Sequence, residues 1–165
     1  MTLYAYADGP LGRMLLVGEE TAAGAAALAS LSLPGQKGGA TVRDGWRHAP
    51  GAFDTVTGQL TEYFAGRLTR FELEYADTGT DFQRRVWAEL EAIPYGATVT
   101  YGEIAARVGT SRAGVRAVGT AIGRNPLLVV RPCHRVIGAD GALRGYAGGL
   151  PSKERLLGLE GALVR

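Results

Sequence analysis

The chain has 165 residues, 46% hydrophobic and 21% charged, so it suits one or two folded domains and is not mainly disordered. No apolar run of about 18 residues occurs, which excludes a membrane-spanning helix, and Asp8 and Arg13 near the N-terminus argue against a secretory signal peptide. The net charge is only +2, but six basic residues stand against nine acidic ones in positions 1–80, and twelve against seven in 81–165.

The first residues of the chain predict strands and a loop. Residues 3–6 and 14–17 flank a cluster of turn residues at 8–12, which predicts a β-hairpin. The Ala-rich residues 22–33 fit a strand or a helix. Residues 34–50 are Gly-rich and charged, so we expect a surface loop.

A helix and a strand are predicted next. Apolar residues recur at helical spacing over residues 53–64, and Gly66 ends this helix. Apolar and acidic residues alternate over 71–75, which predicts a half-buried strand. Residues 77–79 have the composition of a junction. We therefore expect an N-terminal α/β domain at 1–78 and a second domain at 79–165.

The second half is predicted to be mainly helical. Thr80 with Gln83, and Thr100 with Glu103, have the spacing of the capping boxes that open helices. Between these helices, residues 98–100 predict a short extended segment.

A third helix follows a turn at residues 109–110. Ser111 is positioned to cap it, and it runs to about Gly123. With the helix at 101–108 it has the pattern of a helix-turn-helix.

Positive charge is concentrated around these helices. No acidic residue occurs between Glu103 and Asp140, and six arginines lie in that stretch: Arg107, Arg112, Arg116, Arg124, Arg131 and Arg135. Such a field is expected of a protein that binds a polyanion such as nucleic acid. The alternative is a solvated face onto which acidic residues fold from elsewhere.

The third predicted helix has two different faces at about 100° per residue. Val115, Val118 and Ile122 cluster on the side expected to face the core. The other side carries Arg112, Arg116, Gly119 and Gly123. Each glycine costs roughly 1 kcal/mol relative to alanine in a helix, which favours a partner that approaches the backbone. A loosely packed surface helix is the alternative.

The most informative residue is the only cysteine, Cys133, which follows a proline and precedes His134. A thiol becomes a good nucleophile when a nearby base or dipole lowers its pKa, although a lone cysteine also occurs as a small buried hydrophobe. One cysteine allows no intrachain disulfide. With only two histidines besides, it also allows no zinc site of four cysteines, or of two cysteines and two histidines. A single thiol without an export signal predicts a cytoplasmic protein.

The segment Pro132-Cys133-His134-Arg135-Val136 resembles the active-site motif of the O6-alkylguanine-DNA alkyltransferases, also called methylated-DNA–protein-cysteine methyltransferases. Other segments match the family's motifs in the same order: 82–87, 93–96, 100–105, 116–119, 125–126, 145–149 and 159–161. The resemblance implies a ribonuclease H-like α/β N-terminal lobe and a mainly α C-terminal lobe with a winged helix-turn-helix.

The same resemblance implies direct-reversal DNA repair. The alkyl group of O6-alkylguanine, and of O4-alkylthymine, would pass irreversibly from a flipped-out base in duplex DNA to Cys133, one turnover per protein. The implied partner is double-stranded DNA carrying O6-alkylguanine. The protein would act as a monomer, with cooperative binding along DNA left open, and would need no cofactor and no metal ion.

Roles in catalysis are implied position by position. Cys133 would accept the alkyl group, His134 would take the thiol proton through a water, and Glu160 would orient His134. Asn125 would hold the turn between the recognition helix and the active-site strand.

The base pocket and the DNA contacts are implied in the same way. Tyr101 would donate to the leaving guanine, with Lys153 near its O6 side. Tyr146, the backbone at Ala147, and the backbone of Cys133 and Val136 would line the pocket and read the base. The implied DNA-binding residues are Arg116, Arg112, Gly119, Ala117 and Thr120, with Arg116 filling the gap left by the flipped base.

Two arginines lie in or next to the motif. Arg135 is expected to be structural, buried with hydrogen bonds to backbone. Arg131 replaces the apolar residue usual in the family before the Pro-Cys pair, so its contacts stay open.

Two other functions remain as alternatives: a non-catalytic winged-helix DNA-binding regulator, and a thiol hydrolase.

Overall fold

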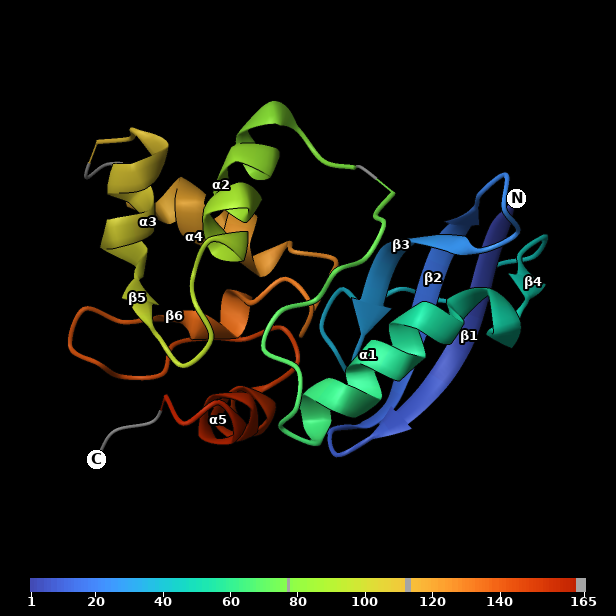
Figure 1. The fold of residues 1–165 in the computed structure, drawn as a ribbon. Helices are drawn as coiled ribbons and strands as arrows, with labels where there is room; N and C mark the ends of the chain where they lie inside the picture. The colour runs from blue at the N-terminus through green and yellow to red at the C-terminus, as the bar shows by residue number, and fades with distance from the viewer. Residues whose placement is uncertain (77, 112–113, 163–165) are drawn as a thin grey trace. The chain divides into compact units, whose positions relative to one another are not determined.

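In the computed structural model, which describes residues 1–76, 78–111 and 114–162, four strands form a mixed sheet in the N-terminal part of the chain (Figure 1). They are β1 (Thr2–Gly9), β2 (Gly12–Glu20), β3 (Ala26–Ser32) and β4 (Arg47–His48), in the spatial order β3-β2-β1-β4. β1, β2 and β3 are successively antiparallel, whereas β4 is parallel to β1. The predicted hairpin is therefore confirmed, and the Ala-rich segment is a strand.

One glycine in this sheet is required by close packing. The pairing of β2 with β3 shifts register between Val17 and Gly18. A Cβ atom on Gly18 would lie 2.6 Å from the carbonyl oxygen of Ala27. The bulge therefore excludes a side chain at this position.

A helix covers one face of the sheet (Figure 1). The short 3-10 helix η1 (Pro50–Phe53) leads into α1 (Asp54–Phe64), and Gly66 follows in a left-handed conformation, as predicted. η1 and β4 interrupt the segment predicted as a surface loop at 34–50. The buried side chains of α1 are Val56, Leu60 and Tyr63.

The regular strand predicted over residues 71–75 is wrong. The side chains do alternate between half-buried and exposed, but the backbone makes only one isolated bridge to β3, Leu28 to Tyr75. The side-chain amide of Gln59 on α1 instead donates to the carbonyl of Glu72 and accepts its N–H, each at 2.9 Å. A side-chain amide thus replaces the neighbouring strand that the sequence pattern predicts.

The chain divides into two compact units, Met1–Thr78 and Gly79–Arg165. Three helices of the second unit pack against one another in pairs: α2 (Asp81–Glu91), α3 (Tyr101–Val108) and α4 (Val115–Gly123). Both predicted capping boxes are confirmed, at Thr80 with Gln83 and at Thr100 with Glu103. No helix in the described part of the chain is long and apolar enough to cross a membrane.

The helix-turn-helix consists of α3 and α4, but α4 begins later than predicted. Gly114 is its N-cap residue and no side chain caps it, so the prediction of Ser111 as the cap is wrong. The carbonyl of Ser111 instead accepts the N–H of Gly114 at 2.8 Å. Arg112 lies outside the described residues.

A two-stranded parallel sheet joins two distant segments of this unit. β5 (Val99–Thr100) pairs with β6 (Val136–Ile137). The pairing aligns the residues just before α3 with those just after the 3-10 helix η3 (Cys133–Arg135). α5 (Leu150–Leu159) packs against η3 (Figure 1). The cysteine thus lies where a strand, a helix start and a second helix converge.

Candidate active site

The backbone that leads to Cys133 is tightly turned. The N–H of Val130 donates to the carbonyl of Leu128 at 2.8 Å, and the N–H of Cys133 donates to the carbonyl of Arg131 at 2.7 Å. Val129, at the centre of the first turn, has φ of 69°, which is strained for a β-branched residue. The surrounding packing holds this strain, because residues 127–130 are all buried.

Asn125 holds these turns together. Its side-chain amide donates to the carbonyl of Leu127 at 3.3 Å and to that of Arg131 at 3.0 Å, while its oxygen accepts the N–H of Leu127 at 3.0 Å. The residue is 2% exposed and follows directly after the C-cap of α4. The structure thus places Asn125 between the second helix of the helix-turn-helix and the segment that carries Cys133.

A buried carboxylate organises the groups beside the cysteine. One oxygen of Glu160 lies 2.8 Å from Nε2 of His134, and the guanidinium of Arg135 contacts both oxygens, at 2.8 and 2.9 Å. Arg135 also donates to the carbonyl of Ile93 at 2.6 Å. The backbone contact expected of Arg135 is therefore present, but its pairing with Glu160 was not predicted.

The same arrangement defines the state of His134. A carboxylate accepts, so Nε2 carries the hydrogen and Nδ1 is left with its lone pair. Nδ1 is buried and has no hydrogen-bond partner among the described residues. Burial lowers the pKa of His134, against the opposing effect of Glu160, so the imidazole is neutral and its Nδ1 is a free base.

Cys133 is 5% exposed, and burial raises the pKa of its thiol to about 11. A hydrogen bond from Asn125 and the positive charges of Lys153 and Arg131 act in the opposite direction. The resting thiol is therefore protonated at neutral pH and needs a base before it can attack a carbon atom.

Lys153 on α5 is completely buried. Its ammonium group donates to the carbonyls of Val136 at 2.7 Å, Arg144 at 3.0 Å and Gly145 at 3.5 Å. Burial lowers the pKa of Lys153 to about 8. The residue thus joins β6 to the loop at 144–145, besides supplying a positive charge near the thiol.

The remaining pocket residues surround the same loop and the start of α3. Tyr101 is the first residue of α3 and is half-buried, and burial together with the charge of Cys133 raises its pKa. Tyr146 and Ala147 are half-buried in the segment that enters α5, and Val136 is fully buried. The structure therefore brings these predicted residues into the same unit as the cysteine.

The exposed face of α4 carries the predicted DNA-contacting residues. Arg116, Ala117 and Thr120 are exposed, whereas Val118 and Ile122 are buried, which confirms the two-faced helix. Val115, predicted to lie on the core side, is half-buried. A Cβ atom on Gly119 or Gly123 would meet nothing within 4 Å. Packing within the described chain therefore does not require glycine on this face.

The positive field is smaller than the sequence indicates. Arg107 lies 4.0 Å from Glu103, so acidic residues from outside the stretch pair with three of its six arginines. The other two pairs are Arg131 with Glu91, at 2.8 Å, and Arg135 with Glu160. These pairs span 40 and 25 residues, a separation that carries no signal in the sequence. Arg116 and Arg124 are exposed and make no ion pair within the described part of the chain.

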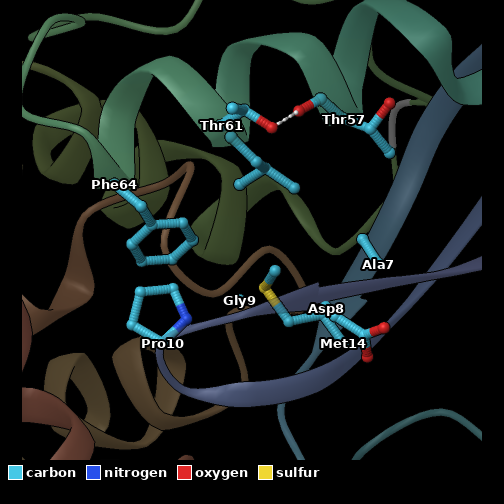
Figure 2. Close-up of a pocket in the computed structure, with 9 residues that line it drawn as sticks. Ala7, Asp8, Gly9, Pro10, Met14, Thr57, Thr61 and Phe64 are labelled. Atoms are coloured by element: carbon cyan, nitrogen blue, oxygen red, sulfur yellow. Dashed lines mark hydrogen bonds between the residues drawn. The ribbon is translucent and has the colours of Figure 1, made fainter.

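The first unit has a pocket of its own, of about 330 Å³, at the turn of the hairpin beside α1 (Figure 2). Pro10, Met14 and Phe64 contribute its apolar wall, and Asp8 lies at its edge. None of the predicted site residues that the structure describes lines it. The chemistry indicated by the sequence thus belongs to the second unit.

Comparison with known proteins assigns each unit to a domain. Residues 2–76 match the ribonuclease-like domain of 6-O-methylguanine DNA methyltransferase, and residues 81–162 match its DNA-binding domain. These matches confirm the predicted fold class.

Whole-chain relatives agree with this assignment. The methylated-DNA–protein-cysteine methyltransferase of Mycolicibacterium paratuberculosis is 47% identical over 97% of this chain and 93% of its own length. That of Methanosarcina acetivorans is 46% identical over 96% and 98%. The crystal structure of Mycobacterium tuberculosis OGT in complex with DNA superposes with a TM-score of 0.87 at 46% identity, covering 97% of this chain and 93% of that one. This chain belongs to the 6-O-methylguanine-DNA methyltransferase family.

Proposed function

We propose that this protein repairs DNA by direct reversal, moving the alkyl group of O6-alkylguanine, and of O4-alkylthymine, onto Sγ of Cys133. The observation that carries the proposal is the buried contact between His134 and Glu160 directly beside the only cysteine. A histidine held in one tautomer by a carboxylate is the arrangement that activates a weak nucleophile.

The transfer is a displacement at carbon. Nδ1 of His134 takes the thiol proton through a water, and Glu160 stabilises the imidazolium that forms. A bond forms between Sγ and the alkyl carbon as the bond from that carbon to O6 breaks. Tyr101 donates a hydrogen bond and then a proton to the departing guanine. The tyrosinate that forms regains a proton from solvent as the imidazolium of His134 gives one up, so charge and protons balance. No cofactor enters the step, and the stable thioether ends the protein's activity after one turnover.

Asn125 and Lys153 position the reacting groups. Asn125 fixes the turn before Cys133, and Lys153 holds the carbonyl of Val136. In the proposed pocket that carbonyl also accepts a hydrogen bond from the exocyclic amine of guanine. The half-buried Tyr146 and the backbone at Ala147 complete the base pocket.

The duplex binds to α4. Gly119 and Gly123 leave open space beside the helix backbone, which lets it approach a groove. Arg116 fills the space of the flipped base, since the alkyl carbon cannot be reached inside the stack. The structure of the Mycobacterium tuberculosis relative in complex with DNA supports DNA as the partner. Residues 79–165 thus form the DNA-binding and alkyl-acceptor domain, and residues 1–78 form a separate α/β domain. We place the protein in the cytoplasm, acting as a monomer on double-stranded DNA that carries O6-alkylguanine.

The proposal is tested by replacing Cys133 with serine. We expect Cys133→Ser to remove no methyl groups from a duplex containing O6-methylguanine, while it binds that duplex as tightly as the parent. Binding draws on α4 and its charges, not on the sulfur atom. Removal of the methyl group by the variant would overturn the proposal. Binding by the parent without any removal would favour a winged-helix regulator.

A further inference from the structure

Arg131 is held by two residues of α2. Its Nε lies 2.8 Å from a carboxylate oxygen of Glu91, and its guanidinium carbon lies 4.9 Å from the ring centre of Trp87. Residues 87 and 91 are one helical turn apart and therefore share a face of α2. The Arg131 side chain is only 12% exposed, although Glu91 is 47% exposed. We call Arg131, Glu91 and Trp87 the arginine clamp.

The backbone of Arg131 is directly connected to the nucleophile. Its carbonyl accepts both the N–H of Cys133 at 2.7 Å and the side-chain amide of Asn125 at 3.0 Å. Only Pro132 separates Arg131 from Cys133, and the proline ring fixes φ near −79°. A displacement of Arg131 would therefore displace the thiol.

Trp87 also contacts the second helix of the helix-turn-helix. Its indole N–H donates to the carbonyl of Ala121 on α4 at 2.9 Å, in a buried contact. One side chain of α2 therefore touches both the helix assigned to DNA and the residue that precedes the Pro-Cys pair.

We propose that Arg131 is a positioning residue, whose docking against Glu91 and Trp87 fixes the backbone that presents Cys133. The inference rests on the proposed alkyl transfer. It also explains how this chain accommodates a charged residue where the family usually has an apolar one: a paired, stacked guanidinium makes the contact with α2 that an apolar side chain would make elsewhere.

The guanidinium charge favours the thiolate as well, so the test must separate position from charge. The variants are Glu91→Leu, Arg131→Leu and the double variant, with Arg67→Leu as the matched control. Arg67 makes an exposed ion pair with Glu62 in the other unit, at 2.7 Å. Single-turnover rates with the free base O6-benzylguanine, which needs no base flipping, give the maximal rate constant kinact and the half-saturating concentration KI.

We expect Glu91→Leu and Arg131→Leu each to lower kinact about tenfold and to leave KI within about twofold, because misplacement of a nucleophile affects the reaction rather than binding. The double variant should be no slower than either single variant, since both changes break the same contact. Arg67→Leu should react like the parent.

Glu91→Leu gives the decisive result. It leaves a positive charge at Arg131 without its partner, so a purely electrostatic role predicts an unchanged or higher kinact. Either of those results would overturn the proposal, as would losses that multiply in the double variant. Glu91 is exposed, so this variant is expected to fold, and thermal unfolding checks that it does.

A second readout does not depend on alkyl transfer. The chain has two tryptophans, so in a Trp46→Phe background the fluorescence reports on Trp87 alone. We expect Glu91→Leu to increase quenching of Trp87 by acrylamide, and unchanged quenching would contradict a clamp. A parent protein that gains no alkyl group while the quenching changes as expected would refute the proposed function and leave the clamp intact.

Discussion

At the scale of single residues, the shared carboxylate of Glu160 explains how a buried histidine acts as a base. Arg135 makes two charge-assisted hydrogen bonds to Glu160, and its positive charge offsets that of the buried carboxylate. Glu160 in turn fixes the tautomer of His134. Removing the side chain of either Arg135 or Glu160 would leave the other as an uncompensated buried charge, which would lower the free energy of unfolding by about 3–5 kcal/mol. The base, its orientation and the local stability of the site therefore depend on one group.

The buried, neutral His134 predicts a pH dependence. Its pKa in the folded protein is below 6.5, so below that pH the unfolded chain binds more protons than the folded one. The corresponding stability is complete above pH 6.5 and is lost as the pH falls through the lowered pKa. We expect both the free energy of unfolding and the rate with O6-benzylguanine to fall as the pH is lowered to about 5.

Urea denaturation and single-turnover rates measured over that range check this prediction. His48→Gln is the matched control, because His48 is exposed, lies in the other unit and is the only other histidine. The control should keep the pH dependence and His134→Gln should lose the part due to histidine. The same dependence in both variants would contradict the assignment of His134.

At the scale of elements, a substitution on the exposed face of α4 should affect protein stability and DNA binding in opposite directions. Gly119 lies inside this helix, and a Cβ atom there would meet open space. We expect Gly119→Ala to stabilise the protein by up to about 1 kcal/mol, because alanine is the better helix former. The same change should slow reaction with duplex DNA, since the added methyl group lies on the face assigned to the groove, and should leave reaction with O6-benzylguanine unchanged.

Thermal unfolding and the two rates measure these effects together. If the variant and the parent react with the duplex at the same rate, the assignment of α4 to the DNA interface is wrong. An equal loss on both substrates would instead mean that Gly119 supports the pocket.

Sequence patterns within a few residues predicted the starts of α2 and α3, whereas contacts between residues far apart in the chain could not be predicted. Both capping boxes depend on residues three apart, and the structure has both as expected. The prediction of a strand at 71–75 failed because the side chain of Gln59 makes the backbone hydrogen bonds that a neighbouring strand would make. No local sequence pattern indicates this contact between residues 13 positions apart. In the candidate site, the motif pointed to Cys133 and His134, but the partners of Arg131 and Arg135 come from elsewhere in the chain and were not predicted.

At the scale of the whole molecule, the pairing of arginines sets how strongly salt should affect DNA binding. With Arg131 and Arg135 paired to acids, few positive side chains of the stretch are free for phosphates. We expect the logarithm of the binding constant to fall with the logarithm of the salt concentration with a slope no steeper than about −3. Fluorescence anisotropy of a labelled duplex measures this slope. A slope of zero would exclude α4 and its arginines as the phosphate-contacting surface, and a much steeper slope would require a second basic surface.

The central claim is that Cys133 keeps the alkyl group, and the mass of the whole protein tests it most directly. The protein is incubated with an excess of duplex DNA containing O6-methylguanine. The masses of the intact protein and of its proteolytic peptides are then measured by mass spectrometry. We predict the gain of one methyl group per molecule, on the peptide that contains Cys133, with no further gain as the excess rises. An unmodified protein beside demethylated DNA would show a hydrolase, and a methyl group on any other residue would contradict the account.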